Sequence, residues 1–158
     1  MTRTALALPT LLPALLLALA GCGGGGDEDA KGRYVDRASA ICTTADEAFT
    51  GLSQPTAATD FAPFVAATVE IAEKAQADLA ALTPPEDDRA RLQSDVLDPF
   101  AALVEEGRAF SAQVEAAGAD QAKLLPLLGQ RPSADGIDLE YLREYGLEPC
   151  ADAIAKVG

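Results

Sequence analysis

Cysteines and carboxylates are the residues of this chain whose types and spacing could support chemistry. The chain has three cysteines and 25 acidic side chains, but it has no histidine. It therefore lacks the commonest general base, the partner of Ser-His and Cys-His nucleophiles, and the commonest ligand of zinc, copper or haem. Carboxylate-only catalysis and a cation site stay open, but no motif distinguishes one pair of carboxylates from the others. We therefore expect no cofactor and no enzyme activity.

The first cysteine, Cys22, has the most specific surroundings. It follows Leu19-Ala20-Gly21, which completes a lipobox at the end of an apolar, proline-broken run. Because a membrane span needs roughly 20 apolar residues, this shorter run predicts a signal peptide. In such a peptide the Cys22 thiol is acylated and cleavage leaves Cys22 as the first residue. The alternative is cleavage after Ala20, at an A-x-A pattern, which would release a secreted protein.

This interpretation divides the chain into three segments. Residues 1–21 are a signal peptide that is removed, residues 22–32 are a lipidated flexible tether, and residues 33–158 are one helical domain. The tether is predicted because its glycines and acidic residues include no bulky apolar side chain. Two or three acyl chains on Cys22 would hold the protein at the outer face of the cytoplasmic membrane.

The charge of the chain excludes some partners. The formal net charge is −13, and removal of the signal peptide, whose only charged residue is Arg3, makes it one unit more negative. Nucleic acid and anionic headgroups both repel such a chain, so we expect no nucleic-acid partner. The membrane is a partner only through the covalent lipid on Cys22.

Apolar residues recur at intervals of three and four, which predicts an all-α fold. We expect a mainly antiparallel helical bundle of three long helices plus short C-terminal helices, closed by one disulfide. The long helices are predicted at 33–52, 59–82 and 86–117, and the short ones at 120–128, 138–145 and 150–157. Pro99 should bend the third helix. The aromatic content is only 5% and alanine is abundant, which favours thin helix seams and argues against an apolar pocket of ~300 Å³ or more.

Cys42 and Cys150 are the remaining cysteines once Cys22 carries lipid. Both fall on predicted apolar helix faces, in a chain exported to an oxidising compartment, so we expect them to form a disulfide. A redox couple is the alternative, but the sequence has no C-x-x-C motif. The acidic groups around residues 86–88 and 135–140 are interpreted as helix caps and turn residues rather than as metal ligands.

One segment near the end of the chain is a candidate partner surface. Its apolar residues point in nearly every direction around a short predicted helix, and two tyrosines four residues apart follow it. The candidate residues are Leu124, Leu125, Leu127, Leu128, Tyr141 and Tyr145. The alternative is a buried segment at the end of the bundle, with half-buried tyrosines.

Four short motifs give the chain a resemblance to a known group. They are Leu19-Ala20-Gly21-Cys22, Ile41-Cys42, Leu82-Thr83-Pro84-Pro85 and Tyr145-Gly146-Leu147-Glu148-Pro149-Cys150. With them the chain resembles small, uncharacterised, alanine-rich lipoproteins of high-GC actinobacteria. The resemblance implies an all-α bundle outside the cytoplasmic membrane with its two late cysteines bonded, and it implies no activity.

The sequence thus leaves three hypotheses for the function. The first is a membrane-anchored envelope lipoprotein that serves as a non-catalytic interaction module for another envelope protein or a wall component. The second is a carrier or sensor that binds a small ligand between its helices. The third is a carboxylate-based enzyme or a cation-binding protein.

Overall fold

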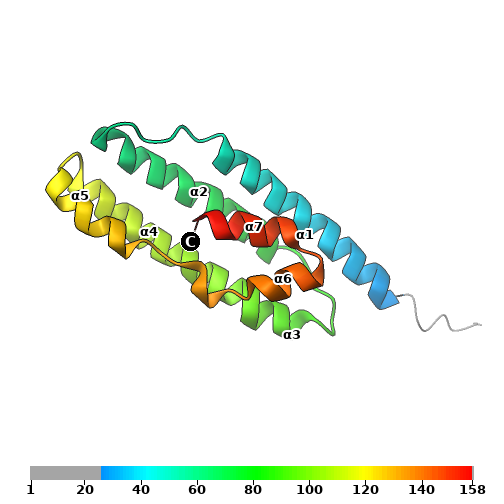
Figure 1. Cartoon of the computed structure of the whole chain (residues 1–158). Coiled ribbons are helices and arrows are strands. Elements are labelled where there is room, and N and C mark those ends of the chain that lie inside the picture. Colours follow the sequence, from blue (N-terminus) through cyan, green and yellow to red (C-terminus); the bar gives the residue numbers. More distant parts are fainter. Residues whose placement is uncertain (1–25, 158) are drawn as a thin grey trace, which may run out of the picture.

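The structure, a computed structural model that describes residues 26–157, is an all-α bundle (Figure 1). Two long helices, α1 (Gly26–Thr50) and α2 (Phe61–Ala80), are followed by a third helical stretch that runs from residue 89 to residue 117. The shorter helices α5 (Gln121–Leu127), α6 (Leu139–Tyr145) and α7 (Glu148–Val157) complete the bundle. The predicted fold class is confirmed. Cys22 and the predicted signal peptide lie outside the described residues.

Helix α1 begins at Gly26, and not at residue 33 as predicted. Residues 26–32, which the sequence assigns to a flexible tether, are therefore helical. Glu28 and Asp29 lie in the first turn of this helix, where the helix dipole favours negative charge. Lys31, one turn further on, places its Nζ 4.1 Å from the centre of the Tyr145 ring. This contact with α6 stabilises a segment that has no apolar stripe of its own.

The third helical stretch is interrupted before Pro99, in agreement with the predicted bend. It consists of α3 (Arg89–Leu92), a π-helical turn (Gln93–Leu97) and α4 (Asp98–Ala117). Pro99 has no N–H to donate to the carbonyl of Asp95, four residues earlier. That carbonyl accepts a hydrogen bond from the Asp138 N–H instead, at 3.1 Å. The break therefore supplies an anchoring point for the segment that leads into α6.

The helices α5 and α6 begin and end within one residue of their predicted bounds, whereas α7 begins at Glu148, two residues earlier than predicted. Asp120 caps α5 by accepting the N–H of Ala122 at 3.0 Å, and Asp138 caps α6 by accepting the N–H of Tyr141 at 2.8 Å. Gly146 ends α6 with φ at 98°, in the left-handed region that glycine adopts without strain. Three 3₁₀ turns, Ala58–Asp60, Leu128–Gln130 and Ala134–Gly136, lie between the helices.

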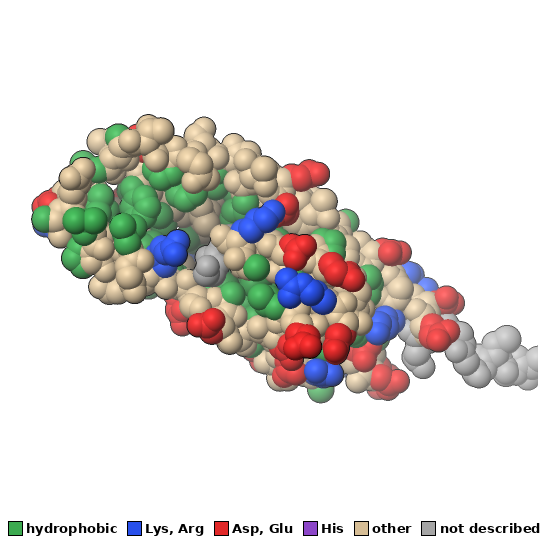
Figure 2. All heavy atoms as spheres, in the orientation of Figure 1, with side chains coloured by type: hydrophobic (Ala, Val, Ile, Leu, Met, Phe, Trp, Pro, Cys, Tyr) green, Lys and Arg blue, Asp and Glu red, His purple; other side chains and the backbone are tan. Residues whose placement is uncertain are grey.

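Charged and apolar side chains are separated along the face of the bundle that Figure 2 shows. Red and blue side chains gather toward the N-terminal end of α1, and green side chains gather toward the end formed by α5 and the α1–α2 loop. Within residues 26–157, no helix combines the length and the apolar composition needed to cross a membrane. On the face that Figure 2 shows, the apolar side chains are therefore concentrated at one end of the bundle.

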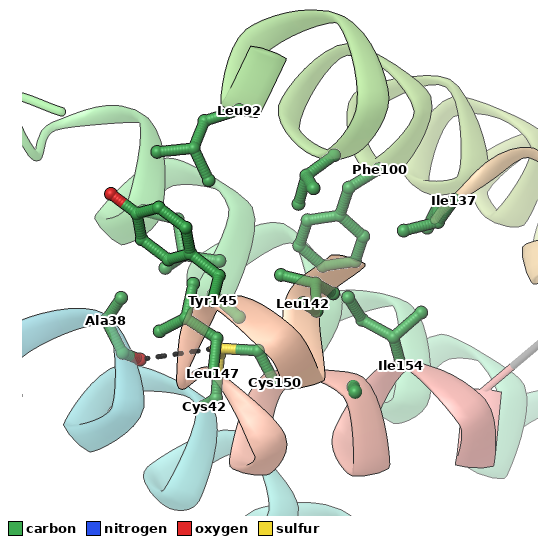
Figure 3. Close-up of a cluster of buried hydrophobic side chains, with 14 of the residues drawn as sticks. Ala38, Cys42, Leu92, Phe100, Ile137, Leu142, Tyr145, Leu147, Cys150 and Ile154 are labelled. Carbon is green, nitrogen blue, oxygen red and sulfur yellow. Dashed lines mark hydrogen bonds between the residues drawn. A yellow bond between two sulfur atoms is a disulfide. The ribbon is translucent and has the colours of Figure 1, made fainter. Parts of the chain in front are cut away.

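The core consists of two hydrophobic clusters. The larger cluster surrounds the disulfide between Cys42 of α1 and Cys150 of α7, whose sulfur atoms are 2.04 Å apart (Figure 3). Leu92, Phe100 and Leu142 are among its buried members. The smaller cluster lies toward α5 and is built on Val65, Phe110, Val114, Ala117 and Leu124. The predicted disulfide is confirmed, and it joins the first helix to the last.

Candidate functional site

An open cavity of about 380 Å³ lies between the C-terminal half of α1, the α1–α2 loop, α2 and α4. Its lining is mainly apolar, and residues of both core clusters contribute to it. The lining residues are Phe49, Thr50, Leu52, Gln54, Phe61, Phe64, Val65, Thr68, Val69, Ala72, Leu103, Val104, Gly107, Phe110, Arg131, Pro132 and Lys156. A cavity of this size is within the range of small-molecule sites. The expectation that thin helix seams leave no such pocket is wrong.

Gly107 of α4 lines the cavity and lies where the two core clusters meet. Gly107 lies one turn after Leu103 and Val104 of the larger cluster and one turn before Phe110 of the smaller one. A Cβ atom built on Gly107 would contact Cγ2 of Val69 on α2, at 3.4 Å. An alanine methyl group at position 107 would therefore meet the Val69 side chain at the cavity wall.

Phenylalanine is concentrated at this cavity. The chain has five phenylalanines, and four of them line the cavity: Phe49, Phe61, Phe64 and Phe110. Phe110 is buried, but the other three lining phenylalanines are only half-buried. The fifth, Phe100, is buried in the larger cluster. In a chain with so few aromatic residues, this placement leaves the largest apolar side chains incompletely covered.

The loop that carries the rim of the cavity is held by Asp60. Its carboxylate accepts hydrogen bonds from the backbone N–H groups of Thr56 and Ala57 and from the hydroxyls of Thr56 and Thr59, at 3.0 to 3.2 Å. These bonds stabilise the charged form and lower the pKa of Asp60. The Asp60 side chain makes no capping bond to α2, and its bond to the Ala57 N–H caps the 3₁₀ turn Ala58–Asp60 that precedes the helix. It fixes the position from which Phe61 and Phe64 enter the cavity.

The polar part of the lining is cationic. Arg131 and Lys156 line the cavity, and no acidic residue does. Lys156 forms an ion pair with Asp46 of α1, whereas no carboxylate in residues 26–157 lies within salt-bridge distance of Arg131. Thr68 donates its hydroxyl hydrogen to the Phe64 carbonyl at 3.0 Å. In a chain with 25 acidic and 12 basic residues, this local excess of positive charge is unusual.

The predicted partner surface is only partly exposed. Leu125 is 68% exposed and Leu128 is 45% exposed, but Leu124 is buried in the smaller cluster and Leu127 is half-buried against it. Tyr141 and Tyr145 are 6% and 5% exposed. The tyrosines therefore do not form a recognition surface, because the N-terminal turns of α1 and the end of α3 cover them.

The two tyrosines instead belong to a buried aromatic group with Tyr34. The Tyr145 ring lies 5.6 Å from the Tyr141 ring and 6.3 Å from the Tyr34 ring, and the Tyr145 hydroxyl donates to Asp88 at 2.7 Å. Asp88 was interpreted as a helix cap, but its carboxylate makes no capping bond to α3. Burial raises the pKa of all three tyrosines, and for Tyr145 the bond to Asp88 raises it further.

The acidic groups that suggested cation sites serve other contacts. Asp95 and Asp138 both pair with Arg91, at 3.3 and 3.9 Å, and the Arg91 guanidinium lies 3.8 Å from the centre of the Tyr141 ring. Over the described part of the chain, no three cysteine or carboxylate side chains converge as a metal site requires. The Asp95 pair lies within one helical stretch, whereas the Asp138 pair connects α3 with the start of α6.

Comparisons of the chain with protein-family models, with curated proteins and with solved structures found no match. The cavity is therefore assessed from its own geometry. The sequence predicts that most of the phenylalanines in the lining lie on apolar helix faces. It does not predict that they surround an open space. Two features of the sequence indicate such a cavity. Three of the five phenylalanines lie within residues 49–64 and a fourth is Phe110, and Gly107 interrupts the apolar stripe of α4.

Proposed function

We propose that the helical domain is a non-catalytic binding module for a small apolar ligand, which it holds in the cavity between α1, α2 and α4. The observation that carries this proposal is that four of the five phenylalanines face an opening of about 380 Å³. Half-buried aromatic rings leave apolar surface in water, at a cost of about 25 cal/mol per Å². A ligand that covers those rings recovers that free energy on binding.

The proposal includes the membrane anchor at Cys22. Helix α1 has 25 residues, so it spans ~37 Å between its start near Cys22 and Phe49 at the cavity. A lipid on Cys22 would hold the opposite end of the bundle near the membrane and leave the cavity accessible from the other side. Intact mass of the membrane-extracted protein should show a diacylated chain that begins at Cys22, and an unmodified chain that begins at Gly21 would refute the anchor.

The binding proposal is tested with a neutral fluorescent probe, N-phenyl-1-naphthylamine. The wild-type domain should bind it with a saturable increase in emission and a stoichiometry of one. Val69→Trp places a large ring in the cavity and should weaken probe binding at least tenfold. Ala77→Trp adds the same ring on the exposed face of α2 and should leave binding unchanged.

Two results would contradict the proposal. One is the absence of saturable binding to the folded wild-type domain. The other is equal binding by Val69→Trp and Ala77→Trp, which would place the probe on the surface rather than in the cavity. Because the chain has no tryptophan, each variant also carries a single emission signal that reports whether the new ring is buried as designed.

Docking on an envelope protein or wall component is the second candidate function. It is supported by the exposed side chains of Leu125 and Leu128 on the outer side of α5 and the turn that follows it. Cross-linking in the native membrane tests it, with a Leu125→Asp variant as the comparison. Loss of a specific cross-linked species in that variant supports docking at α5, and an unchanged set of species contradicts it.

A further inference from the structure

We propose that the ligand is a single-chain carboxylate amphiphile, whose hydrocarbon chain lies among the phenylalanines and whose head group is bound at Arg131. This inference rests on the proposed binding function and adds the chemical class of the ligand. It combines three properties of the same cavity: its apolar wall, its volume and the charge of its rim.

The wall and the volume define the apolar part of the ligand. Rings and aliphatic side chains from α1, α2 and α4 form most of the lining, so a small hydrophilic anion would leave most of it uncovered. The volume of about 380 Å³ is near the lower limit of small-molecule sites, which range from ~300 to 1,000 Å³. One hydrocarbon chain suits this space better than the two chains of a membrane phospholipid.

The rim defines the charge of the head group. Arg131 and Lys156 line the cavity, and Asp46 pairs with Lys156, so the three groups together carry one positive charge. A monoanion balances this charge, whereas a neutral head group leaves it uncompensated and a dianion exceeds it. The lining contains no acidic residue, although the chain has 25 of them. The rim is therefore electrostatically complementary to an anion.

The chemistry of Arg131 favours a carboxylate. A guanidinium presents its N–H donors in a planar fork that matches the two oxygens of a carboxylate. Arg131 lies in extended backbone after the turn Leu128–Gln130, with φ at −61° and ψ at 143°, and it forms no ion pair with a described carboxylate. The guanidinium can therefore bind a ligand without first losing an ion pair to a described carboxylate. Lys156, held by Asp46, adds further N–H donors at the same rim.

Competition against N-phenyl-1-naphthylamine tests this inference with laurate, dodecanol and dodecyl phosphate, which have equal chain lengths. The two anions are kept below their micelle concentrations and dodecanol below its solubility limit. Laurate should displace the probe at least tenfold more effectively than dodecanol, because only laurate carries the charge. Arg131→Gln should reduce the affinity for laurate about tenfold and leave that for dodecanol unchanged. Arg37→Gln, the same substitution at an exposed arginine near the middle of α1 and outside the cavity lining, should change neither.

The outcomes separate this inference from the proposed function. If the probe binds but laurate and dodecanol compete equally, or Arg131→Gln weakens both equally, the carboxylate head group is refuted and the apolar site stands. If dodecyl phosphate competes better than laurate, the head group belongs to another class and the inference is likewise refuted. If the probe itself does not bind, the proposed function fails first. Circular dichroism of each variant confirms that it is folded.

Discussion

The contact between Tyr145 and Asp88 shows how one polar bond can fix a buried residue. The Tyr145 ring is almost fully buried between α1, α3 and α6, and its hydroxyl reaches the half-buried carboxylate of Asp88 at 2.7 Å. A buried hydroxyl without a hydrogen-bond partner is costly, and the bond to Asp88 removes that cost. Tyrosine is therefore better suited to this position than phenylalanine.

Tyr145→Phe should lower the free energy of unfolding by about 1 to 2 kcal/mol, because it removes a hydrogen bond to a charged group but retains the ring. It should also change the response to alkaline pH. The folded state holds the tyrosine proton more tightly than the unfolded state, in which the pKa is about 10. Stability is therefore complete below pH 10 and falls above it, by up to about 1.4 kcal/mol per pH unit for each such tyrosine.

Urea unfolding at pH 8 and at several values above pH 10 measures both effects. The variant should be less stable at pH 8 and should lose stability less steeply at alkaline pH, since Tyr34 and Tyr141 alone keep raised pKa values. Parallel curves for wild type and variant would show that Tyr145 ionises equally in both states, contrary to the prediction.

Helix α4 combines two sequence features that a regular helix avoids. Pro99 follows the π-helical turn and frees the Asp95 carbonyl for Asp138, and Gly107 lies in the cavity wall beside Val69. A helix with an ordinary side chain at position 107 would be more stable by the helix propensity of that residue. Gly107 therefore lowers the stability of α4 at the cavity wall.

Gly107→Ala should raise the free energy of unfolding by about 0.5 to 1 kcal/mol, because alanine restricts the unfolded chain and favours the helix. The new methyl group contacts Val69, which lines the open cavity and can shift. The same variant should bind N-phenyl-1-naphthylamine less tightly. Urea unfolding and probe titration measure the two effects, and a loss of stability would mean that Val69 is fixed.

The periodicity of the sequence predicts the helices well, but it predicts poorly the features that depend on packing between helices. The caps at Asp120, Asp138 and Gly146 depend on neighbouring residues, so local reasoning finds them. The early start of α1 depends on Lys31 and the Tyr145 ring, more than a hundred positions away, and no local pattern contains that contact. The cavity depends on how α2 and α4 align at Gly107, which periodicity alone does not determine. The exposure of Leu125 and the burial of Leu124 depend likewise on how α5 docks.

Across the molecule, one disulfide controls the association of α1 with α7. Cys42 and Cys150 are 108 positions apart, and both are buried in the larger cluster. In the chain-entropy model, closing so long a loop stabilises the folded state by up to about 4 to 5 kcal/mol, although measured values are often smaller.

Replacement of both cysteines, as Cys42→Ala with Cys150→Ala, should lower the free energy of unfolding by about 2 to 5 kcal/mol. Urea unfolding of the variant, compared with wild type in the presence and absence of dithiothreitol, measures the loss. Wild type under reducing conditions should approach the variant. Equal stability of all three samples would mean that the disulfide adds nothing to the packing around it.

The disulfide also determines which parts of the chain carry mechanical load. All residues that line the cavity except Lys156 lie between Cys42 and Cys150, inside the covalent loop. Tension applied between the N-terminal end of α1 and the end of α7 passes through the sulfur atoms and bypasses this loop. A bundle held at Cys22 and pulled from α7 would therefore keep α2, α4 and the phenylalanines free of tension, while the turns before Cys42 extend first.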